Sequence, residues 1–470
     1  MHTHPRPATN RPPLSFLLLL ALLLPLLAAC GGSAAGTAEP VFSNINSGLA
    51  PGGGGTSLPP AEPTRASVAG APTAAPAAAP AAGDAIVKSS ESAAGGAPAI
   101  APPAIGIATP VVPPERINNQ QQGTPLKAGE VDDNADFATY LDYLRSYGGP
   151  PAHEVDVSER YILTVVNDRQ QPVLDARVRL FDGQQQVFEG RTYAGGKTIF
   201  FPRTLKLSGN VTSLRVQVDK GNSAVEGTLS RGQDGAQTFV LRGAEALPQT
   251  PRLDVLFLLD STGSMGDEIG QIQNTIASIA DRIDRIEPRP ELRFGLVAYR
   301  DRGDEYVTRV YDFTPDVGTF QQLLASVRAD GGGDTPESLN EGLHEAIQGV
   351  HWADDAVRLS FLVADAPPHL DYDQDYDYLQ EARRAVAEGV KVYTIGASNS
   401  DDEAEYVFRQ LAQQTLAHFI FLTYQPGQNA GTPGDTTTHH VDPAAFTVER
   451  LDDLVVQVVR RELAQAQGAS

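Results

Sequence analysis

The sequence is poor in cysteine and in basic residues. Its 470 residues include a single cysteine, Cys30, so the folded part can build neither a disulfide framework, nor a zinc site from cysteines, nor a cysteine nucleophile. There are 36 lysines and arginines against 58 aspartates and glutamates, which gives a formal net charge of −22. A chain this acidic has no basic surface for nucleic acid, and general attraction to anionic membranes is not expected.

Residues 1–29 have the pattern of a secretory signal peptide. Arg6 and Arg11 form a positively charged start, and the apolar run behind them is short for a membrane span. Leu-Ala-Ala-Cys-Gly at residues 27–31 resembles a bacterial lipobox. The resemblance implies cleavage before Cys30, lipidation of its sulfur, and an extracytoplasmic chain anchored to the cell membrane or outer membrane. A chance cysteine after a signal peptide and an uncleaved anchor are the alternatives.

Residues 30–126 are rich in alanine, proline, glycine and serine and contain few aromatics. Such a segment cannot bury enough apolar surface to offset the entropy of ordering the chain, so we expect a disordered linker after the lipidated cysteine. In residues 127–151, aromatic and leucine side chains recur at helical spacing after Asp133 and Asn134, either of which could cap a helix. We expect one short helix there, docked onto a domain.

Residues 152–247 change to a period of two. Val178 and Leu180 alternate with arginines, and turn signals such as Asp182-Gly183 follow at short intervals. This pattern predicts an all-β, antiparallel sandwich. Part of the segment resembles a carboxypeptidase-regulatory or transthyretin-like module, and we expect it to act as a spacer or a binding module.

Apolar strands alternate with amphipathic helices in residues 253–466. A continuous apolar run at 253–259 is typical of a strand covered on both faces of a parallel sheet. Isoleucines from Ile269 to Ile286 step by three and four and form one apolar helix face. The pattern predicts a doubly wound α/β fold with a mostly parallel sheet, which binds ligands beyond the carboxyl ends of its strands. A final helix is expected from about 447 to 466.

Oxygen-bearing side chains follow three of these segments. The set comprises two carboxylates and three hydroxyls: Asp260, Thr262, Ser264, Thr335 and Asp365. A helix is expected to begin near Glu337, directly after Thr335. Hard oxygen ligands suit Mg²⁺, with Mn²⁺ or Ca²⁺ possible, and do not suit copper or zinc. Single residues also have structural alternatives, because Asp260 and Thr335 could each cap a helix.

The same residues resemble the metal-ion-dependent adhesion site of the von Willebrand factor type A (VWA) domain family. Asp-Ser-Thr-Gly-Ser-Met at 260–265 matches the D-x-[ST]-x-S signature, and Thr335 and Asp365 match the later threonine and aspartate. The resemblance covers about residues 253–463 and is closest to bacterial members, including lipoproteins. It implies a bound Mg²⁺-type ion whose open position accepts a carboxylate from an exposed Asp or Glu of a protein partner.

The sequence therefore predicts a lipid-anchored, extracytoplasmic binding or adhesion protein rather than an enzyme. Two alternatives stay open. One is a constitutive scaffold of an envelope complex. The other is a metal-dependent hydrolase with Asp334 or His369 as its base. The ligand and the oligomeric state cannot be predicted from the sequence.

Three further motifs lie in the same region. Arg-Gly-Asp at 302–304 spells the integrin-binding tripeptide, although matches of three letters are common by chance. Aspartates alternate in residues 371–378, for which we keep three interpretations: a solvated acidic loop, a tyrosine-rich contact surface and a second cation site. His439 and His440 are adjacent and are expected to be a surface pair. Because little sequence follows the final helix, we expect any coupling to run to the β module.

Overall fold

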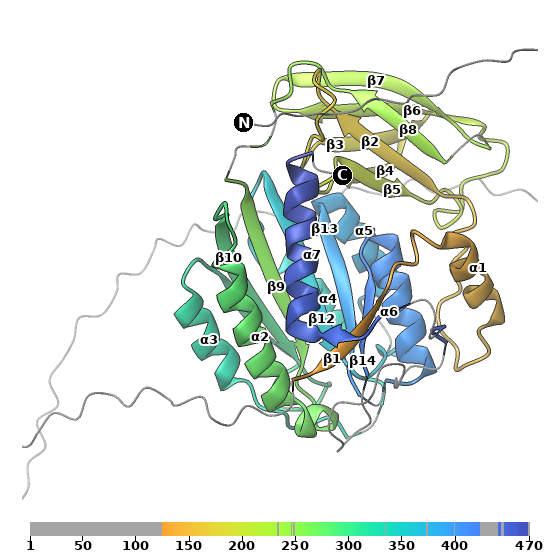
Figure 1. The fold of residues 1–470 in the computed structure, drawn as a ribbon. Helices are drawn as coiled ribbons and strands as arrows, with labels where there is room; N and C mark the ends of the chain where they lie inside the picture. Colours follow the sequence, from red (N-terminus) through yellow and green to blue (C-terminus); the bar gives the residue numbers. More distant parts are fainter. Residues whose placement is uncertain are drawn as a thin grey trace, which may run out of the picture. The chain divides into compact units, whose positions relative to one another are not determined.

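The computed structural model (Figure 1) describes residues 125–232, 235–245, 247, 250–333, 335–372, 375–398, 400–423, 440–442 and 446–468. These residues all belong to one unit of the chain. The predicted signal peptide, Cys30 with its predicted lipidation, and nearly all of the predicted linker lie outside them. Among the described helices, none combines the length and the apolar character that crossing a membrane requires.

An eight-stranded sheet forms the centre of the larger domain, with the strand order β11-β10-β9-β12-β13-β14-β1-β15. The strands are β1 (Lys127–Val131), β9 (Arg252–Asp260), β10 (Glu291–Tyr299), β11 (Thr308–Thr314), β12 (Ala356–Ala364), β13 (Val390–Gly396), β14 (Phe419–Leu422) and β15 (Glu449–Arg450). The five strands β10, β9, β12, β13 and β14 are parallel, whereas β11 and β1 pair antiparallel with their neighbours. The predicted, mostly parallel α/β fold is confirmed.

Helices cover both faces of this sheet (Figure 1). One face carries α2 (Ile269–Ile283), α3 (Val317–Ser326) and α7 (Leu451–Ala466), and the other carries α4 (Leu339–Gln348), α5 (Tyr378–Glu388) and α6 (Asp402–Gln414). The isoleucines that the sequence places on one face of α2 are buried, as predicted.

Two helix starts differ from the prediction. Helix α4 begins at Leu339 instead of near Glu337, because the backbone of Glu337 bonds to Pro367 and His369 in an isolated bridge. Helix α7 begins at Leu451 instead of near 447, because the two residues before it form β15 and pair with β1.

The segment before the sandwich contains a strand that the sequence analysis did not predict. Strand β1 lies between β14 and β15 and so belongs to the large sheet. The predicted short helix, α1 (Phe137–Ser146), follows it, but its cap is Asp136 instead of Asp133 or Asn134. Asp133 is buried and forms a two-pronged ion pair with Arg409 of α6, at 2.6 and 2.9 Å. Tertiary pairing therefore decides the role of these residues.

The expected all-β sandwich lies between α1 and β9. A three-stranded sheet, β5-β2-β8, packs against a four-stranded sheet, β4-β3-β6-β7, around one apolar core. The strands are β2 (Tyr161–Val166), β3 (Arg177–Asp182), β4 (Gln185–Arg191), β5 (Lys197–Phe200), β6 (Ser213–Lys220), β7 (Ser223–Ser230) and β8 (Ala236–Val240). One pair departs from the antiparallel prediction: β2 and β8 are parallel, which the long chain between them permits.

The sandwich contacts the sheet of the larger domain where β12 begins. Asp175 accepts hydrogen bonds from both terminal nitrogens of Arg358, at 3.0 and 3.1 Å, and one from Arg191 at 3.0 Å. Lys220 forms an ion pair with Asp355 at 2.6 Å. Asp175 and Arg358 are both buried. The sandwich is therefore held at the end of β12 that lies away from Asp365.

Candidate metal centre

Three loops begin at one edge of the large sheet. Strand β9 ends at Asp260, β10 ends at Tyr299, and Asp365 directly follows β12. In the parallel register Tyr299 lies beside Asp260, and Leu259 lies beside Val363. Because these strands are parallel neighbours, their carboxyl ends bring the loops together at the place where such folds bind ligands.

Four of the five predicted ligands are joined by hydrogen bonds. Oδ1 of Asp260 accepts from the Thr262 hydroxyl at 2.7 Å and from the Thr262 backbone N–H at 2.9 Å. The Ser264 hydroxyl lies 3.0 Å from that of Thr262 and donates to Oδ1 of Asp365 at 3.0 Å. The hydrogen bonds link the side chains of Asp260, Thr262, Ser264 and Asp365 in that order, and we call this group of four the oxygen ring. Asp260, Thr262 and Asp365 are buried and Ser264 is exposed, so the group reaches solvent at Ser264.

The protons available in the oxygen ring are too few for its contacts. A hydroxyl has one proton to donate. When both carboxylates are ionised, Thr262 gives its proton to Asp260 and Ser264 gives its proton to Asp365. The 3.0 Å contact between the two hydroxyl oxygens then has no proton. Either a proton on one carboxylate or a cation beside the hydroxyls would resolve this close contact.

Thr335, the fifth predicted ligand, is exposed, and in the described part of the chain its side chain forms no hydrogen bond with the other four. The glycine-rich loop before it is nevertheless attached to the oxygen ring. The backbone N–H of Gly263 donates to the carbonyl of Gly331 at 3.0 Å, and that of Asp330 donates to the carbonyl of Ser261 at 3.1 Å. The structure thus places the loop of Thr335, but not its hydroxyl, at the ring.

Tyr299 is a neighbour of the oxygen ring that the sequence analysis missed. Its hydroxyl donates to Oδ2 of Asp260 at 3.1 Å, and its side chain is fully buried. Burial raises the pKa of Tyr299 well above its ordinary value, so the hydroxyl keeps the proton that it donates. It therefore orients Asp260 from the side opposite Thr262.

Glu337 is a third carboxylate at this edge, and the sequence analysis treated it only as the start of a helix. It is 2% exposed, and its Oε2 atom has no hydrogen-bond partner among the described residues. A Cβ on Gly332 would lie 2.7 Å from Oε1 of Glu337 and 3.1 Å from Cβ of Thr262. Gly332 also has a φ of +63°, which favours glycine. Glycine at this position therefore allows both Glu337 and Thr262 to approach the loop. The sequence feature that could have identified Glu337 is its position two residues after the predicted ligand Thr335.

The three carboxylates share an electrostatic environment that opposes their ionisation. Burial raises the pKa of Asp260, and burial together with the charge of Asp260 raises the pKa of Asp365. Burial and the negative charges of Asp260, Asp301 and Asp365 raise the pKa of Glu337 to about 9. Groups in this state take up either protons or a cation.

The Arg-Gly-Asp tripeptide is engaged within the protein. Arg302 forms ion pairs with Glu341 at 2.6 Å and with Asp375 at 2.7 Å. The carboxylate of Asp304 accepts from the backbone N–H of Asp301 at 3.1 Å and from that of Gly332 at 2.8 Å. These contacts use both charged ends of the motif to hold loops together, which favours the interpretation of a chance match.

The acidic segment 371–378 is described except for residues 373 and 374. Its carboxylates have different partners: Asp371 contacts His369 at 2.8 Å, Asp375 contacts Arg302, and Asp377 caps α5 and pairs with His153. Within the described residues, no three His, Cys, Asp or Glu side chains are placed to hold a metal ion directly. These positions give no support to a calcium loop, and direct ligation at the oxygen ring would need its hydroxyls.

Of the remaining predicted residues, Asp334 and His439 lie outside the described ones. His369 is buried beside the acidic segment, with Nε2 3.4 Å from Asp301. His440 lies 3.6 Å from the carboxylate of Asp402 and packs its ring near that of Tyr143. These described contacts join His440 to helices α6 and α1.

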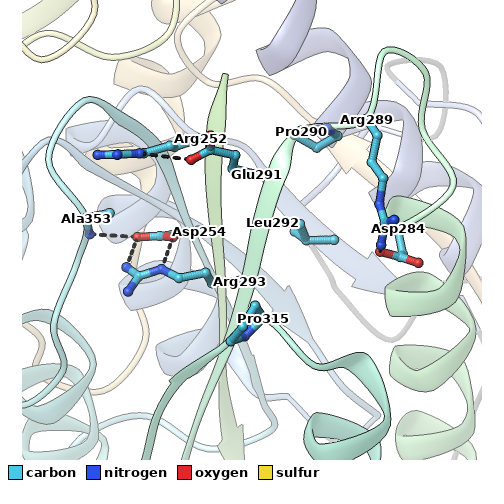
Figure 2. A pocket seen from close by; sticks show the side chains of 10 residues that line it. All are labelled: Arg252, Asp254, Asp284, Arg289, Pro290, Glu291, Leu292, Arg293, Pro315 and Ala353. Carbon is cyan, nitrogen blue, oxygen red and sulfur yellow. Dashed lines mark hydrogen bonds and ion pairs between the residues drawn. The ribbon is translucent and has the colours of Figure 1, made fainter. Parts of the chain in front are cut away.

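A hollow of about 600 Å³ lies elsewhere, at the amino ends of β9 and β10 (Figure 2). Its charged side chains are paired: Arg293 with Asp254 at 2.6 Å, Arg252 with Glu291 at 3.2 Å, and Arg289 with Asp284. Asp254 and Asp260 stand at opposite ends of β9, so this hollow is separate from the oxygen ring.

Residues 254–425 match the family model of the von Willebrand factor type A domain. This part of the chain, which carries the oxygen ring, is a VWA domain. Similar curated proteins include the alpha-protein kinase vwkA of Dictyostelium discoideum, 29% identical over 127 residues, and the human von Willebrand factor A domain-containing protein 7, 32% identical over 120 residues. The alignments cover 27% and 26% of this chain but only 20% and 12% of the two relatives.

Among the solved structures that resemble the chain, two illustrate that the sequence identities and the TM-scores are low. Proximal thread matrix protein 1 from the mussel byssus, with a zinc-occupied MIDAS motif, is 14% identical with a TM-score of 0.32, over 44% of this chain and 48% of that one. The conserved hypothetical protein BatB from Bacteroides thetaiotaomicron is 12% identical with a TM-score of 0.31, over 45% of this chain and 98% of that one. At these values the superpositions carry no information about the oxygen ring.

Proposed function

We propose that the chain is a binding protein whose VWA domain holds a divalent cation of the Mg²⁺ type, with Mn²⁺ or Ca²⁺ as alternatives, at the oxygen ring. Its ligands would be the predicted set: Asp260, Thr262, Ser264, Thr335 and Asp365. When bound, the ion supplies a positive site with an exchangeable position. We propose that this position accepts a carboxylate from an exposed Asp or Glu of a protein partner.

The observation that carries the proposal is the hydrogen-bonded ring itself. Four side chains from two loops place neighbouring oxygen atoms 2.7 to 3.0 Å apart, and the pKa values of both carboxylates among them are raised. All the donors are hard oxygens, which fit Mg²⁺ and its neighbours better than copper or zinc. The ring opens at exposed Ser264, and exposed Thr335 follows the attached loop, so solvent-side donors are available to complete the coordination.

A local positive charge is also what this chain needs in order to bind an acidic group. The net charge of −22 repels acidic partners at long range. A divalent ion at the ring would reverse the sign of the field at close range, because a bound cation is the largest local charge in such a site. This restricts binding of acidic partners to the metal position.

The location of the protein is part of the proposal. The lipobox-like residues 27–31 support lipid anchoring through Cys30 and an extracytoplasmic position at the cell membrane or outer membrane. Expressed in a bacterium, the unaltered chain should sediment with membranes, whereas Cys30→Ser should leave the membrane fraction. Equal retention of both on membranes would contradict anchoring through this residue.

Metal titration tests the central step. We expect the full chain, solubilised in detergent, to bind Mn²⁺ in a saturable calorimetric titration, and Mg²⁺ to compete. Asp260→Asn removes the negative charge of a proposed ligand and should weaken Mn²⁺ binding by about 100-fold or more. This loss corresponds to about 2.8 kcal/mol or more of binding free energy. Asp182→Asn, an exposed aspartate of the sandwich, is the matched control. If both variants bind Mn²⁺ like the unaltered chain, the ring is not the site.

A second titration tests the role in partner binding. Acetate added to the Mn²⁺-loaded chain should lower its enhancement of water proton relaxation, because a carboxylate takes the place of exchangeable water. Methanesulfonamide, a neutral molecule of similar size, should have no effect. An unchanged relaxation signal with acetate would mean that the ion serves the structure of the domain, as expected of a constitutive scaffold.

A further inference from the structure

Both backbone polar groups of Glu337, its N–H and its carbonyl, form hydrogen bonds that hold it beside the oxygen ring. Its N–H donates to the carbonyl of Pro367 at 3.0 Å, and its carbonyl accepts from the N–H of His369 at 3.1 Å. Both partners belong to the loop that follows Asp365 at the end of β12. The side chain then extends beside Thr262, next to the place that a Cβ on Gly332 would fill. Glu337 is therefore fixed near both loops of the ring and is not a mobile surface residue.

The charge of Glu337 is not compensated by the described residues. The charges that act on it most strongly are all negative: Asp260, Asp301, Asp365 and Asp304. The arginines of the loop after β10 are engaged elsewhere: Arg300 donates to the carbonyl of Arg328 at 2.9 Å, and Arg302 pairs with Glu341 and Asp375. A buried carboxylate oxygen without a partner is costly, and such groups are normally paired or contact an ion or water.

We infer that Glu337 is an outer-sphere carboxylate of the cation site, acting on the bound ion through a bridging water. The inference rests on the proposed function, since it assigns a further residue to the same ion. Direct ligation is not proposed, because the described carboxylates are not placed for three to contact one ion. A bridging water would satisfy the unpartnered Oε2 atom, and the ion would balance its charge.

This assignment changes the charge balance of the site. Asp260 and Asp365 alone neutralise a divalent ion, so a partner carboxylate would bring the total to minus one. With Glu337 ionised, the total is already minus one before the partner arrives. Glu337 should therefore tighten retention of the metal and weaken its attraction for a partner carboxylate. Opposite effects on the two affinities distinguish an electrostatic role from a merely structural one.

The test is a Mn²⁺ titration of the full chain and of Glu337→Gln, which keeps the shape of the side chain and removes its charge. We expect Glu337→Gln to bind Mn²⁺ about 10- to 100-fold more weakly, the range seen when outer-shell groups of metal sites are changed. Glu345→Gln is the matched control, because it removes the same charge from the same α4 region at the far end of the helix. Its Mn²⁺ affinity should stay within about twofold.

Acetate binding to the Mn²⁺-loaded proteins gives the second readout. Glu337→Gln should bind acetate more tightly than the unaltered chain, and Glu345→Gln should not. If Glu337→Gln misfolds, Glu337→Asp keeps the charge and should retain most of the Mn²⁺ affinity. Unchanged Mn²⁺ affinity in Glu337→Gln, with Asp260→Asn still impaired, overturns the inference and leaves the proposed function intact. Absence of Mn²⁺ binding in the unaltered chain overturns both.

Discussion

The two ends of the central strands treat buried charge in opposite ways. At the amino end, Asp254 of β9 is buried and accepts two hydrogen bonds from Arg293 and one from the backbone of Ala353 (Figure 2). At the carboxyl end of the same strand, Asp260 is equally buried, but hydroxyl groups and a backbone N–H contact it and no arginine or lysine among the described residues pairs with it.

The same contrast holds on β12. Arg358 near its start is paired with Asp175 of the sandwich, whereas Asp365 after its end contacts Ser264 and is repelled by Asp260. Buried ions that are fully paired serve structure, because breaking the pair leaves a charge in a medium that cannot solvate it. Buried carboxylates without a paired cation instead take up a proton or a bound ion. The paired amino end is therefore the end where the sandwich docks, and the unpaired carboxyl end is the proposed binding end.

The largest effect is expected at the docking end. Asp175→Ala leaves Arg358 buried without its carboxylate and should lower the free energy of unfolding by about 3–5 kcal/mol. Urea unfolding measures this, with Asp182→Ala, an exposed neighbour in the sandwich, expected within about 0.5 kcal/mol of the unaltered chain. Mn²⁺ affinity of folded Asp175→Ala should be unchanged. A changed affinity would mean that the sandwich and the ring are coupled, which is the route predicted from the sequence for any coupling.

An intermediate effect is expected from pH at the binding end. The pKa of Glu337 rises from its ordinary 4.5 to about 9 in the folded chain, and those of Asp260 and Asp365 rise as well. The folded state then binds more protons than the unfolded state, so stability present at low pH is lost as the pH rises towards about 9.

Thermal melts of the metal-free chain in EDTA, at several values between about pH 5 and pH 9, should therefore give a falling midpoint. Saturating Mg²⁺ should remove most of the fall, because the ion replaces the protons. A melting midpoint in EDTA that stays level or rises over this range would contradict the raised pKa values of these three carboxylates.

The smallest effect is expected from Tyr299→Phe. This change removes one hydrogen bond to Asp260 and keeps the packing of the ring, so Mn²⁺ affinity should fall by about two- to tenfold. Tyr393→Phe is a suitable control, because its buried hydroxyl donates to Glu462 of α7 instead. Equal Mn²⁺ affinities for the two variants would show that Tyr299 has no part in orienting Asp260.

Local patterns in the sequence were sufficient to predict the α/β fold. The apolar run of β9 and the isoleucine spacing of α2 depend only on neighbours along the chain. Strand β1 was not predictable in this way, because its five residues carry no strong period and their partners, β14 and β15, follow about 300 residues later. The start of α4 was likewise decided by the bridge of Glu337 to another loop.

The ring was predictable to the extent that its residues are close in sequence or end a strand. Asp260, Thr262 and Ser264 lie within five positions, and Asp365 directly follows an apolar strand. Tyr299 was missed because its contact arises from the register between β9 and β10. Nor does the spacing show that the side chain of Thr335 is exposed and, among the residues that the structure describes, forms no hydrogen bond with the other four.

The central claim is that the carboxyl end of the sheet holds a cation, and its most direct test is an anomalous difference map from crystals of the chain grown with Mn²⁺. We predict one strong peak within coordination distance of Asp260, Ser264 and Asp365, with Glu337 in its outer shell. A map with no peak among these side chains, at a Mn²⁺ concentration that saturates binding in solution, would contradict the account.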